Sequence, residues 1–306
     1  MELRQLEYFL TVAEEGSFTA AAARLYMVQS SLSASLLSLE RELGTDLFIR
    51  GRRGTELTDA GRALLGPARA ALAETERARD AVAEVTGLLR GSVRVTAMAV
   101  PRVVDVADTI RELQSEHPGV DVHVLPSGAQ GMVDLVTDGQ VDFAIGPRTP
   151  RVGPALSFTP LLSDPLTLVC PAGHRLSGAR DVDPADVLAE PVIDLAPRWW
   201  ARNLFDTWVQ EGKLRRRVRL EINEWLTVLG LVQRGMGVAY GPAACIDQET
   251  FRGVTTATLS GAPRWELGVI ARDEVLRGAA GRVFLAAYLD RCRSVTGGGA
   301  GVRKSS

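Results

Sequence analysis

The stretch that decides the fold of the first part of the chain runs from Gly16 to Gly44 and reads GSFTAAAARLYMVQSSLSASLLSLERELG. Ser17 precedes an alanine-rich run that favours a helix, and a short break at residues 26–28 separates it from a second helix at 29–43. Small and polar residues cover one face of this second helix, and leucines form the opposite stripe. The leucines of the stripe are Leu32, Leu36, Leu39 and Leu43. This arrangement predicts a helix-turn-helix.

The residues on either side extend this unit. Apolar residues at helical spacing before Gly16 predict a first helix that ends at this glycine. Residues 47–58 form two short extended runs around a basic tip with a glycine on each side. This pattern predicts a β-hairpin, or wing, next to the helix-turn-helix.

A long helix is then predicted from Asp59 to about Leu89. Small and apolar residues alternate along it by three and four, which is the spacing of a coiled-coil seam. The seam comprises residues 60, 64, 68, 71, 75, 78, 82, 85 and 89. Pro67 lacks a backbone donor, so we expect a kink in the first turns. The helix either packs on its own domain or pairs with a second chain, and its length favours pairing.

From Gly91 the pattern changes to alternating strands and helices. The predicted strands of the first such unit are 92–96, 120–125 and 142–146. With helices between them, they predict a mostly parallel sheet covered by helices. A second unit begins near Pro165, and a strand at 267–271 and a helix at 276–293 close the chain. The glycine- and serine-rich segment 294–306 is expected to be disordered.

Length and composition set limits on the class of protein. With 306 residues, 46% of them hydrophobic and 24% charged, the chain has a globular composition and room for more than one hydrophobic core. The amino terminus has no cationic start before an apolar run, so no secretory signal is expected, and no segment predicts a membrane span. The cysteines, Cys170, Cys245 and Cys292, lie far apart, which favours a reduced cytoplasmic protein with inert buried thiols.

An enzyme and a free-standing solute receptor are two classes of protein that the sequence could also encode. The sequence has three histidines and carries no nucleophile elbow, phosphate-binding loop or H-E-x-x-H pattern. Cys170 and His174 lack the further ligands of a structural zinc site, so we expect neither a metal nor a cofactor. The strand and helix repeats alone fit a solute receptor, but the first 90 residues and the missing signal sequence argue against one.

Several short segments follow one another in a characteristic order. They are LEYF at 6–9, GSFTAAA at 16–22, Leu25 with QSSLS at 29–33, LE at 39–40, LG at 43–44, LF at 47–48, Arg50 and LTDAG at 57–61. With these segments the chain resembles the LysR-type transcriptional regulators over essentially its whole length. Downstream, DFAIG at 142–146 and GMGVA at 235–239 resemble recurring parts of the family's effector domain, and each is a weaker signal alone.

The resemblance implies an α+β multi-domain chain. It would carry a winged helix-turn-helix, a dimerising linker helix, and an α/β region of two Rossmann-like subdomains similar to a periplasmic binding protein. We therefore divide the chain into a DNA-binding domain (1–58), a linker helix (59–90), an effector-binding domain (91–293) and a tail (294–306). Within the effector-binding domain, subdomain I comprises 91–161 and 266–293, and subdomain II comprises 162–265.

The partners are also implied by the resemblance. The protein is expected to bind double-stranded DNA, to bind a small-molecule effector in the cleft between the subdomains, and to form dimers and tetramers. A regulator of this kind would act on transcription with RNA polymerase as a further partner.

Contacts with DNA depend on individual side chains, because the net charge is −2 and the first 62 residues hold seven arginines against nine acidic residues. Family members usually carry a basic residue or glutamine near positions 34 and 37, whereas this chain has Ala34 and Leu37. Gln29, Ser30 and Ser33 remain available to contact base edges and phosphates. The arginines of the wing could contact flanking phosphates. Alternatively, the serines only cap helices and the arginines solvate a loop. The candidate DNA-binding residues are Ser17, Thr19, Gln29, Ser30, Ser33, Ala34, Leu37, Arg50, Arg52 and Arg53.

Effector contacts are expected where strands end and helices begin. The resemblance implies a hydroxyl after the first strand for a carboxylate ligand, but this chain offers only Thr96 there. Arginines supply charge instead, and Met98, Trp200 and other aromatic residues suit an apolar pocket. Each tryptophan equally fits a place in the core or at the subdomain interface. The candidate effector residues are Thr96, Ala97, Met98, Arg102, Ser127, Gly128, Arg148, Pro197, Arg198, Trp199 and Trp225.

Overall fold

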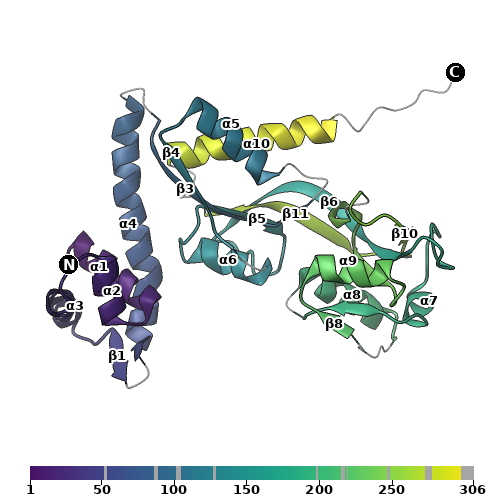
Figure 1. Ribbon diagram of the computed structural model, residues 1–306, viewed down its shortest axis with the longest axis horizontal. Helices are drawn as coiled ribbons and strands as arrows, with labels where there is room; N and C mark the ends of the chain where they lie inside the picture. Colours follow the sequence, from purple (N-terminus) through teal and green to yellow (C-terminus); the bar gives the residue numbers. More distant parts are fainter. Residues whose placement is uncertain are drawn as a thin grey trace.

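The computed structural model describes residues 1–51, 54–85, 89–100, 105–126, 129–197, 199–214, 218, 220–246, 249–272 and 278–297. A small helical unit lies at one end of the molecule, and a long helix connects it to a larger α/β region (Figure 1). The helical unit consists of α1 (Leu3–Glu15), α2 (Phe18–Arg24), α3 (Gln29–Leu43), β1 (Phe48–Gly51) and β2 (Gly54–Leu57). The predicted helix-turn-helix and wing are confirmed.

An aromatic cluster joins the wing of this amino-terminal unit to its helices. The ring of Phe48, on β1, lies 5.4 Å from that of Phe9 and 5.5 Å from that of Phe18 between centroids. Offset and tilted aromatic pairs of this kind add to the stabilisation that burial alone provides. The first strand of the wing is therefore part of the core rather than a loose appendage.

The leucine stripe of α3 faces the same core. Leu32, Leu36 and Leu39 are fully buried. Leu43, predicted as the fourth member of the stripe, is instead 41% exposed. It is the last residue of α3 and directly precedes Gly44.

The long helix α4 (Asp59–Val85) uses its seam in two ways. In its first half, Ala60, Leu64 and Ala68 pack against the core of the amino-terminal unit, and Ala68 is almost fully buried. In its second half, Ala78 and Val82 are exposed, the latter by 68%. Packing on its own domain therefore accounts for only the first half of the predicted seam.

One prediction for this helix needs correction. The helix α4 continues as one element through Pro67, where the expected kink stays a prediction. Leu89, predicted as its last seam residue, lies outside the helix and packs against the core of the α/β region. Residues 86–88 lie outside the described part of the chain.

The α/β region is built on a seven-stranded sheet with the order β10-β6-β11-β5-β3-β4, in which β9 also pairs with β6. Its strands are β3 (Gly91–Ala97), β4 (Val120–Val124), β5 (Phe143–Pro147), β6 (Ser157–Pro171), β9 (Ala239–Pro242), β10 (Val254–Thr258) and β11 (Arg264–Ala271). Within the described residues of this sheet, β3 pairs in parallel with β4 and β5, and the remaining pairs are antiparallel. The parallel sheet predicted for the first unit is therefore confirmed for its strands β3, β4 and β5. The long strands β6 and β11, which lie beyond that unit, run antiparallel to their neighbours.

Lobe I, the part of the region next to α4, is a layered sandwich. Here α5 (Val106–Glu116) and α10 (Ala279–Gly297) pack on one face of the sheet and α6 (Ala129–Thr137) packs on the other (Figure 1). The alternation along β5 shows this directly, since Phe143 and Ile145 join the core under α5 and α10 while Ala144 joins the core under α6.

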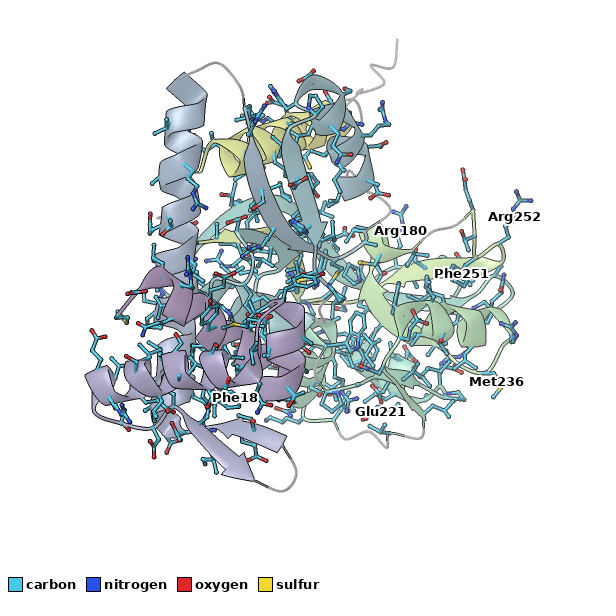
Figure 2. All side chains as sticks on the ribbon, turned by 60° about the vertical axis from the view of Figure 1, so that its left-hand side comes forward. Phe18, Arg180, Glu221, Met236, Phe251 and Arg252 are labelled. Atoms are coloured by element: carbon cyan, nitrogen blue, oxygen red, sulfur yellow. The ribbon has the colours of Figure 1, made fainter. Side chains whose placement is uncertain are left out.

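Lobe II lies beyond the crossing strands. It contains α7 (Pro184–Leu188), β7 (Ile193–Leu195), α8 (Trp200–Glu211), β8 (Leu220–Ile222) and α9 (Trp225–Gln233), together with β9 and β10. The long strands β6 and β11 pass through both lobes and connect them. Lobe II projects away from the amino-terminal unit, so that Phe18 and Met236 mark opposite sides of the molecule (Figure 2).

The carboxyl-terminal helix is longer than predicted. Because the first helix-breaking residues after Arg293 are the glycines that begin at 297, α10 continues to Gly297. Residues 294–297 are therefore helical and do not belong to a disordered tail, while 298–306 lie outside the described residues. Among the helices that the structure describes, none is both long and apolar enough to cross a membrane.

Candidate functional site

The outward face of α3 is accessible and carries small and polar side chains. Gln29, Ser30 and Ala34 are exposed, Ser33 is partly buried, and Leu37 is 41% exposed. The buried leucines hold the opposite face in the core. The second helix of a helix-turn-helix is thus anchored on one side and open on the side that would enter a DNA groove.

Two hydrogen bonds organise the start of α2 and its relation to α3. The backbone N–H of Ala20 donates to Ser17 Oγ at 3.4 Å, so this serine caps α2. Thr19 Oγ1 donates to Gln29 Oε1 at 3.2 Å. The bond orients the Gln29 side chain, whose amide nitrogen keeps its donor hydrogens for another partner.

Glu40 fixes the direction of the wing relative to α3. Its buried carboxylate accepts the backbone N–H groups of Leu47 at 2.8 Å and Phe48 at 3.3 Å. Two amides at the start of β1 are thereby bonded to α3 itself. The first strand of the wing is therefore bonded to the same helix that carries the outward face.

The basic tip of the wing is only partly described. Arg50 lies in β1 opposite Thr55, and its side chain lies outside the described part of the structure. Arg52 and Arg53 lie outside the described residues altogether. The backbone N–H of Thr55 donates to Gly16 O at 2.9 Å, which ties the second strand of the wing to the turn before α2.

One exposed aromatic residue of this surface was missed in the sequence. Tyr26, in the turn between α2 and α3, is 97% exposed and has a φ of 52°, an uncommon backbone conformation for a tyrosine. The N–H of Met27 donates to Ala22 O at 3.0 Å and holds the turn in this shape. The sequence did offer a signal for this exposure, because Tyr26 is an aromatic residue in the turn of the helix-turn-helix and does not belong to the leucine stripe.

Arg24 is less suited to DNA contact than its position suggests. It donates to Glu14 at 2.9 Å and to Glu15 at 3.0 Å. Hydrogen bonds to Glu15 and Glu14 raise the pKa of Arg24. Its charge is therefore balanced within the unit, between α1 and α2.

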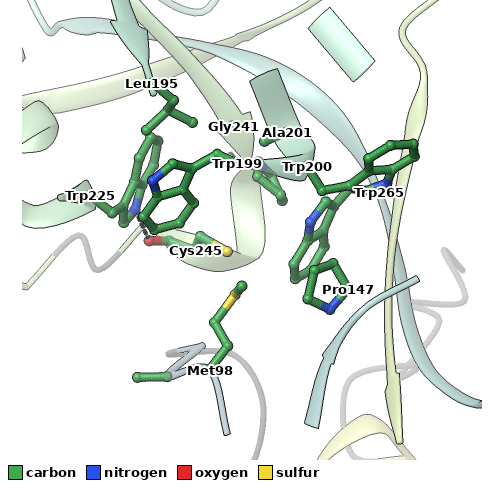
Figure 3. A pocket seen from close by; sticks show the side chains of 12 residues that line it. Met98, Pro147, Leu195, Trp199, Trp200, Ala201, Trp225, Gly241, Cys245 and Trp265 are labelled. Carbon is green, nitrogen blue, oxygen red and sulfur yellow. Dashed lines mark hydrogen bonds between the residues drawn. The ribbon is translucent and has the colours of Figure 1, made fainter. Parts of the chain in front are cut away.

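A cavity of about 70 Å³ lies where lobes I and II meet, several times the ~10–15 Å³ needed to admit one water molecule. Lobe I contributes residues at the ends of β3 and β5, and lobe II and β11 contribute the others. The lining residues are Met98, Ala99, Pro147, Leu195, Trp199, Trp200, Ala201, Trp225, Gly241, Pro242, Cys245 and Trp265. Trp199 and Trp225 lie on one side, Trp200 and Trp265 on the other, and Met98 faces them from lobe I (Figure 3).

The Trp225 indole is held in place from two directions. Its Nε1–H donates to Cys245 O at 2.7 Å (Figure 3). A Cβ on Gly241 would lie 2.6 Å from the far end of the same ring, so the absence of a side chain there lets the indole lie against β9. On the same side of the cavity, Trp199 Nε1–H donates to Asn223 Oδ1 at 3.2 Å.

Glu224 caps the helix that begins with Trp225. Its carboxylate accepts the backbone N–H of Leu226 at 2.8 Å and both the N–H and the hydroxyl of Thr227 at 2.5 and 2.6 Å. Burial alone would raise the pKa of Glu224, but these hydrogen bonds lower it on balance. A negative charge is thus already bonded at the start of α9.

A buried ion-pair network lies behind the wall formed by Leu195. Arg202, in α8, donates to Leu195 O at 2.7 Å and to Asp206 at 2.9 Å, and its NH1 atom lies 3.7 Å from the Asp194 carboxylate. The hydroxyl of Tyr240 donates to the same carboxylate at 2.7 Å. Burial alone would lower the pKa of Arg202, but Asp194 and Asp206 raise it on balance, so the arginine keeps its charge. The network joins β7, α8 and β9 beneath the cavity.

The structure brings some of the predicted effector residues together and separates others. Met98, Trp199 and Trp225 line the cavity, and Trp200 does so beside them. Thr96 is fully buried within β3, and Ala97, the last residue of that strand, does not reach the lining. Pro197 is exposed on the surface.

The predicted charged contacts are mostly elsewhere or undescribed. Arg148 is exposed, with NH1 3.4 Å from Glu266 and its guanidinium 5.3 Å from the centre of the Phe158 ring. Arg102, Ser127, Gly128 and Arg198 lie outside the described residues. Trp265 and Cys245 also line the cavity but were not predicted to do so, because nothing in their local pattern links them to β3 or α8.

The thiol in the cavity wall is not reactive. Burial, with a smaller contribution from Asp164, raises the pKa of Cys245 to about 12. Burial likewise raises the pKa of Cys170 to about 11. Both are therefore protonated at neutral pH and are poor nucleophiles.

Comparison with known proteins identifies both parts of the chain. Residues 3–62 match the family model described as bacterial regulatory helix-turn-helix protein, lysR family, and residues 86–293 match the model described as LysR substrate binding domain. The HTH-type transcriptional regulator ShiR of Corynebacterium glutamicum is 32% identical over 243 residues, which cover 78% of this chain and 82% of that protein.

Solved structures share the fold. A full-length OxyR variant from Pseudomonas aeruginosa superposes with a TM-score of 0.74 over 96% of both chains, at 21% identity. The effector binding domain of QuiR in complex with shikimate covers 67% of this chain and 98% of its own length, with a TM-score of 0.57 and 15% identity. Taken together with the family models, the exposed α3 face and the two-lobed region place the chain in the LysR family of transcriptional regulators, DNA-binding proteins with an effector-binding domain rather than enzymes.

Proposed function

We propose that a small molecule in the cavity between lobes I and II modulates the binding of this regulator to double-stranded operator DNA. The observation that carries the proposal is that the cavity takes lining residues from both lobes, so a ligand there would draw the lobes together. Residues 1–58 would bind DNA, residues 59–90 would connect this domain to the rest of the chain, and residues 91–293 would bind the effector. The boundaries between the two subdomains would lie near residues 161 and 266.

The DNA contacts would be divided between two surfaces. Gln29, Ser30 and Ser33 would reach base edges and phosphates, and Leu37 would meet a thymine methyl group. Arg50, Arg52 and Arg53 would grip flanking phosphates. Ser17, Thr19 and Ala34 would complete the surface by orienting or flanking these side chains.

Pairing of chains would compensate for the low positive charge of one amino-terminal unit. The exposed second half of α4, with Ala78 and Val82, is available to a second copy of this helix. Two or four units bound to neighbouring half-sites would add their affinities through a high effective concentration. The regulator would therefore act as a dimer or tetramer, in the cytoplasm and together with RNA polymerase.

Closure of the lobes would provide the link between effector and DNA. A ligand that binds the closed arrangement more tightly shifts the population toward it, and a change in the angle between lobes would alter the spacing of paired DNA-binding units. QuiR, which has the same fold, is known with shikimate in its effector binding domain. This supports a small-molecule ligand for the corresponding region here.

Retardation of DNA in a gel tests the proposal. The intact purified protein is titrated onto the DNA upstream of its own gene and onto a random duplex of equal length at low salt, with a metabolite panel present or absent. We expect preferential retardation of the upstream fragment and a ligand that changes it. Equal retardation of both duplexes under every condition would refute the proposal.

A further inference from the structure

The cavity between the lobes is lined by aromatic and apolar groups. Four of its walls are indoles, those of Trp199, Trp200, Trp225 and Trp265, and Met98 closes it from lobe I (Figure 3). The described lining residues include no charged side chain. Such a surface favours ligands whose ring faces or edges can pack against other rings.

Two of the four indole N–H groups that line the cavity are committed to the protein itself. The indole N–H groups of Trp225 and Trp199 already donate to Cys245 O and Asn223 Oδ1. These two rings therefore offer carbon surface and π-electrons rather than hydrogen bonds. The Cys245 thiol, with its raised pKa, adds a soft and neutral group.

Charged groups near the cavity also have other partners. Arg202, although part of α8, is directed toward Asp194 and Asp206 behind the wall. Arg148, the residue after Pro147, lies against Glu266 and the Phe158 ring. The described arginines near the cavity are thus already balanced by carboxylates.

The start of α9 is closed to an anionic ligand. The Glu224 carboxylate already accepts the N–H groups of Leu226 and Thr227, which are the donors that a bound carboxylate would use. A second negative charge at this position would meet the first one and would find the N–H groups of Leu226 and Thr227 already taken.

The size of the cavity limits the ligand further. A dry apolar cavity of ~150 Å³ holds one benzene molecule. The cavity here is about 70 Å³, less than half of that volume, so a single ring enters only if the lobes adjust around it.

We infer that the effector enters this cavity with an uncharged, single aromatic ring that packs between Met98 and the indoles. The inference rests on the proposed effector function of the cavity. Such a ligand differs from a polyhydroxylated acid such as shikimate, which needs a counter-ion that the described lining does not supply. Ring packing, rather than charge, would then select the ligand.

Matched small molecules test the class. Benzyl alcohol and cyclohexylmethanol have the same shape and polar group, but only the first is aromatic; benzoate carries the charge, and shikimate carries the charge and hydroxyl groups. Binding of each to the intact protein is measured by ligand-observed NMR titration. We expect benzyl alcohol to bind about 5-fold more tightly than cyclohexylmethanol, and more tightly than benzoate and shikimate. Equal binding of the first pair, or tighter binding of either acid, would overturn the inference.

Variants locate the bound ring. Trp200→Ala and Met98→Ala each remove a half-buried wall on opposite lobes, and we expect either to weaken benzyl alcohol binding about 10-fold. Leu226→Ala, at a position that is 59% exposed and outside the lining, is the control and should change nothing. If Trp200→Ala does not fold, Met98→Ala still decides, because Met98 lies just after the end of β3 and is only partly buried. Unchanged affinity in Met98→Ala would refute the assignment.

The same preparations separate this inference from the function on which it rests. Protein that prefers its upstream DNA but binds none of the aromatic probes would refute the aromatic effector and leave the regulator intact. Protein that shows no preference for upstream DNA would refute the proposed function itself.

Discussion

The amino-terminal unit and the cavity between the lobes are built on opposite principles. The surface offered by α3 comes from one continuous segment, in which Leu32, Leu36 and Leu39 are buried and the residues between them are exposed or partly buried. The cavity instead joins Met98, Pro147, the start of α8, Trp225 and Trp265, which are scattered over more than 160 residues. A contiguous surface can be inferred from local periodicity, whereas a dispersed one depends on how strands and helices are arranged.

The two regions can be followed independently in one sample. All five tryptophans lie between residues 199 and 265, so intrinsic tryptophan fluorescence reports the effector-binding region. DNA affinity reports the amino-terminal unit. A substitution that changes the fluorescence but not the DNA affinity, or the reverse, therefore shows that the two regions fold and function independently.

The largest effect is expected for Arg202→Met. The substitution leaves the fully buried Asp194 without its nearest cation and costs about 3–5 kcal/mol of unfolding free energy. Urea unfolding followed by tryptophan fluorescence should show a large loss, while DNA affinity at low urea persists. Arg234→Met, an exposed arginine on the neighbouring helix, serves as the control and should cost less than about 0.5 kcal/mol. Similar losses for both variants would contradict a stabilising role for the network.

Leu36→Ala is the counterpart in the amino-terminal unit. It empties a fully buried position in α3 and should cost about 2–5 kcal/mol in that unit, with loss of DNA binding. The adjacent Leu37→Ala, at a residue that is 41% exposed, should weaken DNA binding with little change in stability. Circular dichroism and DNA titration distinguish these outcomes. A shift of the tryptophan unfolding midpoint in Leu36→Ala would mean that the two regions unfold together.

A smaller effect is expected where α4 meets the wing. A Cβ on Gly61 would lie 2.3 Å from Leu47 O, so Gly61→Ala should move the helix or the wing and cost about 1–3 kcal/mol. Gly66→Ala, one and a half turns later on the same helix, meets no atom within 4 Å and should be neutral or stabilising by up to ~1 kcal/mol. Thermal unfolding of the pair by circular dichroism checks the contrast, and equal midpoints would show that the close contact does not matter.

The smallest effect concerns pH and the cavity wall. Because hydrogen bonds lower the pKa of Glu224 in the folded protein, its contribution to stability is complete well above the ordinary glutamate pKa of about 4.3 and is lost as the pH falls through the lowered value. Glu224→Gln should cost about 1 kcal/mol at pH 7 and progressively less toward pH 4. Urea midpoints by tryptophan fluorescence across this range provide the measurement. A difference that does not depend on pH would exclude the charge as its cause.

Much of the amino-terminal unit was predictable from sequence because its information is local. The spacing of leucines, Ser17 as a cap and the glycines around the wing each determine structure within a few residues. Leu43 differs from the other leucines of the stripe because it is exposed at the last turn of α3. Tyr26 was overlooked, because its exposure depends on the shape of the turn.

The effector-binding region was less predictable because its pairing is not local. The strand pattern alone could not reveal that β6 and β11 pass each other in opposite directions, and β7, α7 and β10 are too short, at three to five residues, to give a periodic signal. The predicted Met98, Trp199 and Trp225 do line the cavity, since each lies where a strand ends or a helix begins. Trp265 lies within β11 and reaches the cavity only through the sheet topology.

The most direct test of the account is the ratio of affinities for upstream and random DNA, measured by fluorescence anisotropy with the intact protein at one fixed salt concentration. We predict a preference of at least about 1,000-fold for the upstream duplex, the lower end of what specific recognition gives. The double variant Gln29→Ala and Ser33→Ala should lower this ratio by at least about 10-fold without moving the tryptophan unfolding midpoint. A ratio near one for the unmodified protein, or a ratio that the double variant leaves unchanged, would contradict recognition through the outward face of α3.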